Sequence, residues 1–140
     1  MDFLTSFKIL SSGLAAQRAK MDVIVSNMAN VETTRTPEGG PYKRKTVVLA
    51  AAPVGNVFGS AMKDAIRSVK VDSISEDKSV KMLYDPSHPD ADAAGFVAKP
   101  NVNPLTEMVD MIAASRNYEA CVTAFDATKN MALKTLDMGK

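Results

Sequence analysis

The sequence contains few of the residues that form disulfides and zinc sites. Its 140 residues include one cysteine, one histidine and no tryptophan. A single cysteine cannot form an intrachain disulfide, and with a single histidine it cannot supply the common Cys/His zinc frameworks. The 17 basic and 16 acidic residues also lack the basic excess of a dedicated nucleic-acid binder. We therefore expect neither structural zinc nor nucleic acid as a partner.

Long apolar runs and a signal peptide are also missing. No apolar stretch approaches the roughly 18–20 residues that cross a bilayer. Residues 1–8 lack the basic start, apolar middle and small-residue cleavage site of a secretory signal. We expect a soluble cytoplasmic product whose export, if any, uses a route without a cleaved signal.

Proline is absent from both ends of the chain. All seven prolines, and five of the seven glycines, lie between Pro37 and Pro104. Because proline disrupts helix interiors, its distribution predicts two helical ends around an irregular middle. The expected divisions are residues 1–36, a β-rich region at 37–104, and 105–140. We predict an α+β fold in which the two helices pair as a coiled-coil-like bundle with a small β-rich unit between them.

In the first segment, apolar residues recur at spacings of three and four, which predicts a helix over about residues 3–28. Two asparagines near its end, Asn27 and Asn30, are expected to shape the exit of the chain from the helix. The expected seam of this helix contains Leu4, Phe7, Leu14, Met21, Val25 and Met28.

A longer helix is predicted from residue 105 onward, with Pro104 at its first position and Asn103 or Asn101 as its cap. Its apolar positions recur about every 3.4 residues, close to the spacing of a left-handed coiled coil. Arg116 and Glu119 share one face and are expected to set register between helices or subunits. The expected seam of this helix contains Met108, Ile112, Tyr118, Val122, Phe125, Ala132 and Leu136.

Alternating apolar and polar residues in the middle region predict short strands near residues 46–49, 69–72 and 80–84. Proline- and glycine-rich segments at 37–41 and 85–89 predict turns. Two long helices and a small antiparallel unit of two to four strands enclose little core in 140 residues. We therefore expect another chain to cover much of the apolar helical surface.

One loop could bind a metal ion. Asp85, His88, Asp90 and Asp92 offer ligands of the kind that Ca²⁺ or Mn²⁺ prefers, but the calcium-loop pattern is missing. The same residue types are typical of tight turns, and we favour the turn.

No nucleophile has the expected surroundings. Cys121 lies within a predicted helix without a group that lowers its thiol pKa, and Ser26 lacks the Gly-x-Ser-x-Gly elbow. A glycine-rich phosphate loop is absent as well. We predict a protein without enzymatic activity, small-molecule substrate, cofactor or bound metal.

The only run of three basic residues is Lys43, Arg44 and Lys45. It could contact phosphate or an anionic membrane, but basic residues at a strand edge are more often solvated and discourage edge pairing. We favour the solvated edge.

Several segments match a known pattern. Ser26-Asn27-Met28-Ala29-Asn30 resembles the Ser-Asn-x-Ala-Asn motif that follows the N-terminal helix of flagellar rod and hook subunits. The loops at residues 34–42 and 84–92 and the helical segment at 114–120 resemble the same family. The chain is thus identified as a member of the flagellar rod and hook axial-protein family.

The resemblance implies a non-enzymatic subunit of the proximal flagellar rod, located in the basal body of the bacterial flagellum and spanning the periplasm. It also implies uncleaved export through the flagellar type III apparatus, and assembly through the terminal helices with copies of itself and other rod subunits. Ser26, Asn27, Ala29 and Asn30 would form the motif, with Arg116 and Glu119 fixing register. A helical adaptor or secretion-system component of unrelated role is the alternative.

Overall fold

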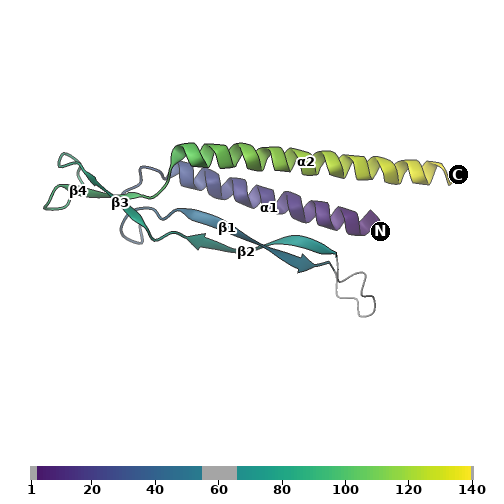
Figure 1. The fold of residues 1–140 in the computed structure, drawn as a ribbon, viewed down its shortest axis with the longest axis horizontal. Coiled ribbons are helices and arrows are strands. Elements are labelled where there is room, and N and C mark those ends of the chain that lie inside the picture. Colours follow the sequence, from purple (N-terminus) through teal and green to yellow (C-terminus); the bar gives the residue numbers. More distant parts are fainter. Residues whose placement is uncertain (1–2, 55–65, 140) are drawn as a thin grey trace.

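A computed structural model describes residues 3–54 and 66–139. Two helices enclose four strands along the chain, and the first helix lies between the second helix and one of two β-hairpins (Figure 1). This arrangement confirms the predicted α+β class. The elements are α1 (Phe3–Ala29), β1 (Lys45–Pro53), β2 (Arg67–Glu76), β3 (Val80–Tyr84), β4 (Phe96–Pro100) and α2 (Pro104–Asp137).

The two helices run antiparallel and pack lengthwise, so that α1 begins and α2 ends at the same end of the molecule (Figure 1). The rings of Phe7 and Phe125 lie 4.9 Å apart between centroids. Farther along the pair, a Cβ atom on Gly13 would lie 3.5 Å from Cys121 Sγ. Small residues allow this close approach, and Ala16 and Ala114 are both buried.

The start of α2 follows the predicted capping pattern. Asn103 is the N-cap, and its side-chain oxygen accepts a hydrogen bond of 3.1 Å from the Leu105 amide. Pro104 occupies the first turn, where its missing N–H leaves no intrahelical bond unmade.

Strands β1 and β2 form a long antiparallel hairpin, with Lys45 opposite Glu76 at one end and Pro53 opposite Arg67 at the other. A bulge between Val48 and Leu49 shifts the register. The hairpin lies along α1, and the Val69 amide donates to Ser12 Oγ on that helix at 3.2 Å. These strands contain the two predicted at residues 46–49 and 69–72.

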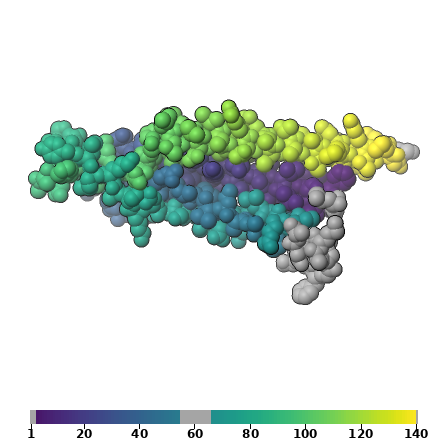
Figure 2. Space-filling model, in the orientation of Figure 1, coloured from purple at the N-terminus to yellow at the C-terminus, as the bar shows by residue number. Residues whose placement is uncertain are grey.

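Strands β3 and β4 form a second antiparallel hairpin, which projects beyond the start of α2 (Figure 2). Tyr84 and Phe96 pack edge to face, with 5.3 Å between their ring centroids. Every residue of β3 is exposed, whereas Val97 of β4 is buried. Strand β3 was predicted from the alternation of apolar and polar residues. Strand β4 was not predicted, because its residues alternate little and lie among glycine and proline.

Neither helix is long and apolar enough to cross a membrane within the part of the chain that the structure describes.

Candidate assembly site at the helix junction

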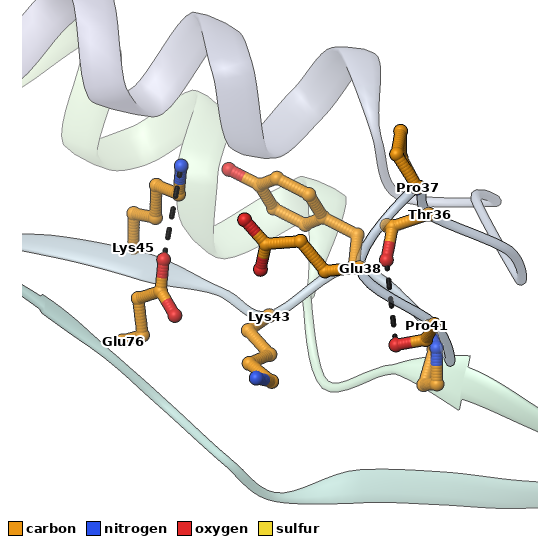
Figure 3. A pocket seen from close by; sticks show the side chains of 9 residues that line it. Thr36, Pro37, Glu38, Pro41, Lys43, Lys45 and Glu76 are labelled. Atoms are coloured by element: carbon orange, nitrogen blue, oxygen red, sulfur yellow. Dashed lines mark hydrogen bonds and ion pairs between the residues drawn. The ribbon is translucent and has the colours of Figure 1, made fainter.

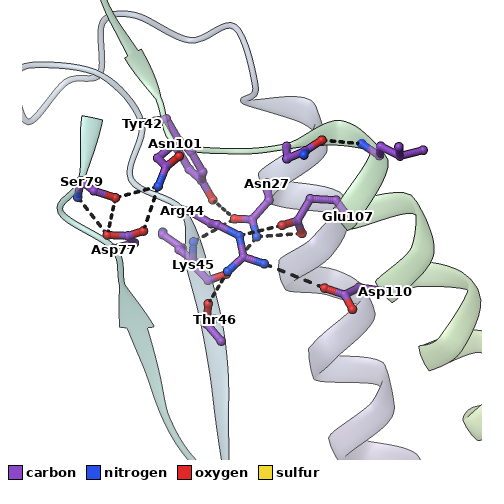
Figure 4. Close-up of polar contacts among 12 residues, drawn as sticks. Asn27, Tyr42, Arg44, Lys45, Thr46, Asp77, Ser79, Asn101, Glu107 and Asp110 are labelled. Carbon is purple, nitrogen blue, oxygen red and sulfur yellow. Dashed lines mark hydrogen bonds and ion pairs between the residues drawn. The ribbon is translucent and has the colours of Figure 1, made fainter. Parts of the chain in front are cut away.

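Asn27, near the end of α1, is the centre of a buried polar cluster (Figure 4). Its side-chain oxygen accepts hydrogen bonds from the Lys45 amide at 2.9 Å and from Tyr42 Oη at 3.1 Å. Its side-chain nitrogen donates to the Lys45 carbonyl at 2.9 Å and to Glu107 Oε2 at 3.1 Å. One amide thereby joins α1, the start of β1 and the first turn of α2.

Glu107 contributes the acidic member of this cluster. Its side chain is 1% exposed, and Oε1 accepts a hydrogen bond from Arg44 Nε at 2.7 Å. Arg44 also lies 3.9 Å from Asp110 and donates to Thr46 Oγ1 at 3.1 Å. A buried carboxylate without partners costs several kcal/mol, and here both oxygens are hydrogen-bonded, one to a cation.

The rest of the motif organises the end of α1. Asn30 Nδ2 donates to the Ser26 carbonyl at 2.8 Å, and Asn30 Oδ1 accepts from Thr33 Oγ1 at 3.2 Å. The Ser26 hydroxyl lies 3.1 Å from Tyr42 Oη, while Ala29 is exposed. The Ser26 carbonyl also accepts from the Asn30 amide at 3.2 Å, so both nitrogens of Asn30 bind the last turn of α1.

A smaller polar cluster lies beside the first (Figure 4). Asn101 Nδ2, just before α2, donates to Ser79 Oγ at 2.8 Å and to Asp77 Oδ2 at 3.4 Å. The Ser79 amide and hydroxyl donate to Asp77 Oδ1 at 2.9 and 2.7 Å. These hydrogen bonds lower the pKa of the Asp77 carboxyl, and the backbone donor contributes most.

The structure divides the residues of the expected helical seams. Those that are partly buried are Phe7, Leu14, Met21, Met28, Tyr118, Phe125 and Ala132. Those that are exposed are Leu4, Val25, Met108, Ile112, Val122 and Leu136. The exposed members remain available to another chain, whereas the first group includes the Phe7–Phe125 contact between the helices.

Arg116 and Glu119 are both exposed on α2, and no ion pair joins them within the described segments. Their expected role in register therefore has no intrachain contact to support it.

The prediction that the side chains of the basic run are solvated was wrong for Arg44. This residue points inward to Glu107 because a buried carboxylate on α2 needs a cationic donor. Lys43 is exposed, as expected, and Lys45 Nζ lies 3.8 Å from Glu76.

A shallow hollow lies where the 37–41 turn meets the start of β1 (Figure 3). Thr36 Oγ1 donates to the Gly40 carbonyl at 3.1 Å and closes the turn. Lys43 and Lys45 line the hollow together with Glu38 and Glu76. The charged side chains that line the hollow are thus two of each sign.

The loop considered for metal binding is held by its own hydrogen bonds. Asp85 Oδ1 accepts from Ser87 Oγ at 2.6 Å and from the Ser87 amide at 3.2 Å, and these bonds lower the pKa of Asp85. His88 Nδ1 accepts from the Asp90 amide at 3.1 Å, and Asp92 Oδ1 accepts from Ala93 N. Across residues 3–54 and 66–139, no three His, Cys, Asp or Glu side chains are grouped to hold a metal ion.

Sequence reasoning missed three members of the buried cluster: Tyr42, Arg44 and Glu107. They lie 15 to 80 residues from Asn27 along the chain, so local periodicity carries no sign of their meeting. One signal was present in the sequence. Glu107 is a charged residue on the helix face that also contains Ala114, Tyr118 and Cys121, at successive spacings of seven, four and three residues.

Comparison with known proteins identifies the family to which this architecture belongs. Residues 7–35 match the model described as flagella basal body rod protein, and residues 93–138 match the flagellar basal body rod FlgEFG protein C-terminal model. The chain is 46% identical to flagellar basal-body rod protein FlgC of Bacillus subtilis, over 96% of this chain and 97% of the relative. The chain belongs to the FlgC family. FlgC of Borreliella burgdorferi is 46% identical over 94% of this chain and 93% of its own, and FlgC of Salmonella typhimurium is 39% identical over all of both.

Membership of the FlgC family confirms the predicted role as a structural subunit of the flagellar basal-body rod and the predicted location in that rod. It also sets aside the adaptor of unrelated role. The FlgC relatives are named as rod proteins, and this agrees with a structural rather than a catalytic role.

Proposed function

We propose that this FlgC-family chain builds the rod by packing the outer faces of its terminal helices against copies of itself and against other rod subunits. It acts through packing and register and carries out no catalysis. It reaches the rod through the flagellar type III export apparatus, without removal of a signal segment.

The observation that carries the proposal is an apolar surface on the first three turns of α2, away from α1. It consists of four exposed side chains, and we call it the outer apolar face: Leu105, Met108, Val109 and Ile112. Leu105 is 71% exposed and Ile112 is 55% exposed. Burial of these apolar side chains against another protein surface removes them from water and so stabilises the association of the two surfaces.

The remaining exposed members of the expected seams extend this surface. Leu4 and Val25 lie on α1, and Val122 and Leu136 lie farther along α2. Burial of these side chains between subunits would offset the conformational entropy lost when the helices become ordered. Arg116 and Glu119 are exposed on the same helix as the outer apolar face and are proposed to fix register by pairing across subunits.

Ile112→Asp tests the proposal. A carboxylate on the outer apolar face would be buried without a partner in the assembled rod, so we expect rods and swimming to be lost. Because Ile112 is exposed in the single chain, the chain itself should fold as before. The measurement is the number of copies in purified basal bodies, with circular dichroism of the purified chain as the folding check.

Asn117→Asp is the matched control. It places the same charge on an exposed, already polar position of α2 that points away from the outer apolar face, and we expect normal rods. Normal incorporation of the Ile112→Asp chain into rods would contradict the proposal.

A further inference from the structure

Glu107 is the most deeply buried charged side chain in the described part of the molecule, and its two oxygens have different partners. Oε1 binds Arg44, which immediately precedes β1, and Oε2 binds Asn27 near the end of α1. One carboxylate on α2 therefore connects both other elements that meet at the junction (Figure 4).

The connection matters because, among the residues that the structure describes, the backbone of α2 makes no close contact with strands β1 and β2. The hairpin contacts α1, and α1 contacts α2. Asn27 holds both the amide and the carbonyl of Lys45, the first residue of β1. Glu107 binds Asn27 and Arg44 at the same time, so α2 reaches the hairpin through these side chains.

Glu107 also lies across α2 from the outer apolar face. At about 100° per residue, the mean direction of Leu105, Met108, Val109 and Ile112 lies about 150° from that of Glu107. A helix whose first turn is fixed in rotation by a buried ion pair presents a fixed set of side chains on its opposite side. Rotation of α2 by one residue position would instead place Met108 or Thr106 in the junction.

We propose that Glu107 is a positioning residue that couples docking of the β1–β2 hairpin to docking of α2, and so orients the outer apolar face toward neighbouring subunits. The part concerning neighbouring subunits rests on the proposed function. The coupling within the chain is independent of it. Arg44 and Asn27 carry the effect of Glu107 to β1.

The test uses Glu107→Gln in the full chain. Glutamine has the same length but only one acceptor oxygen, and Arg44 and Asn27 both present donors, so one donor would face an NH₂ group. We expect the Lys45 amide to exchange with solvent at least about tenfold faster, because a buried donor without a partner favours opening of the junction. Hydrogen exchange of that amide, followed by NMR, is the measurement.

Two further variants separate a specific contact from general damage. Asp126→Asn makes the same change from carboxylate to amide at an exposed position of α2 and should leave exchange at Lys45 unchanged. Arg44→Gln added to Glu107→Gln supplies an acceptor for the new NH₂ group and should recover most of the lost protection. In cells, rod incorporation should fall with Glu107→Gln and recover with the double variant.

Equal exchange at Lys45 in wild type and Glu107→Gln would overturn the inference, as would an unprotected Lys45 amide in wild type. The inference would also be overturned if the two substitutions acted additively, so that the free energy of opening at Lys45 in the double variant fell by the sum of the decreases in the two single variants. Normal rods with Ile112→Asp would instead contradict the proposed function and leave the exchange result standing, so the two failures are distinguishable.

Discussion

The two hairpins of this molecule have the same local form but are held in different ways. The β1–β2 hairpin lies along α1, and the buried Asn27 side chain fixes its first residue. The β3–β4 hairpin packs against neither helix in the described part of the chain. Its contacts outside the hairpin include the ion pair of Lys99 Nζ with Glu32 at 2.6 Å and the hydrogen bond from Thr34 Oγ1 to Asp90 at 2.8 Å, and Val97 of β4 is buried.

The difference indicates where stability comes from. Two strands alone are marginally stable in water, so each hairpin depends on what it is attached to. Opening of β1–β2 at Lys45 requires disruption of a buried cluster shared with both helices. Opening of β3–β4 exposes Val97 and breaks exposed polar contacts, but it disrupts no buried contact with a helix that the structure describes. We therefore expect β3–β4 to open at a lower free energy than β1–β2.

The largest effect on this comparison is expected from Asn27→Ala. The change leaves the amide and carbonyl of Lys45, Tyr42 Oη and one oxygen of Glu107 without their present partner. Loss of this network should lower the free energy of unfolding by about 3–5 kcal/mol and bring opening of β1–β2 toward that of β3–β4. Urea unfolding of the full chain measures it, with Asn117→Ala on the exposed surface of α2 as control. If Asn27→Ala lowered the free energy of unfolding no more than the control does, the cluster would not be what holds the hairpin.

A smaller and local effect is expected from Gly95→Ala. Gly95 has φ +81°, and a Cβ atom there would lie 2.9 Å from Tyr84 Cε2 and 3.3 Å from Pro86 Cβ. The strained backbone alone costs about 1–2 kcal/mol, and the contact with Tyr84 adds to it. The Asp85 amide, which donates to the Gly95 carbonyl at 2.9 Å, should exchange faster while the Lys45 amide does not change.

Gly39→Ala separates the two causes. Gly39 has φ +90° with nothing within 4 Å of an added Cβ, so it introduces the backbone strain without the contact. Gly95→Ala should be the more destabilising of the two substitutions. Equal decreases in stability would mean that the Tyr84 ring moves aside freely.

Acid is expected to have the smallest effect, and to act beside β3. The pKa values of Asp77 and Asp85 lie below their ordinary value of 3.8 because serine hydroxyl and amide groups donate to the folded carboxylates. The stability from these hydrogen bonds is therefore present above the unfolded pKa, and it is lost as the pH falls through the lower folded values. Amide exchange at Ser79 and Ser87 should rise from about pH 4 downward.

Asp77→Asn and Asp85→Asn should each remove the acid dependence at the neighbouring serine amide. The ranking of the two hairpins would be contradicted if, as the pH falls, exchange of the Lys45 amide rose before exchange of the Ser79 and Ser87 amides.

The sequence was sufficient to predict the helices because their signals are local. Absence of proline, apolar spacing and a cap at Asn103 placed the helices close to Phe3–Ala29 and Pro104–Asp137. Alternation likewise identified β1, β2 and β3. Strand β4 was missed because its residues carry little alternation and pair with β3 across a loop.

The packing at the junction could not be predicted in the same way. Apolar spacing favoured Met108 and Ile112 as seam residues of α2, but the structure exposes both and buries Glu107 and Ala114 instead. Close helix packing selects small side chains, and a carboxylate can be buried once distant donors reach it. Neither condition depends on hydrophobicity, and the donors to Glu107 come from remote parts of the chain.

The Asn27 side chain has one more consequence, which concerns the open edge of a sheet. A two-stranded hairpin exposes unpaired backbone groups along its outer edges, and such edges can recruit strands from other molecules. At Lys45 the outward amide and carbonyl of β1 are already bound to Asn27, which takes the place that a neighbouring strand would occupy. For a subunit of the flagellar basal-body rod, which assembles with other rod components, the Asn27 amide thereby blocks one position at which a strand of another molecule could pair with β1.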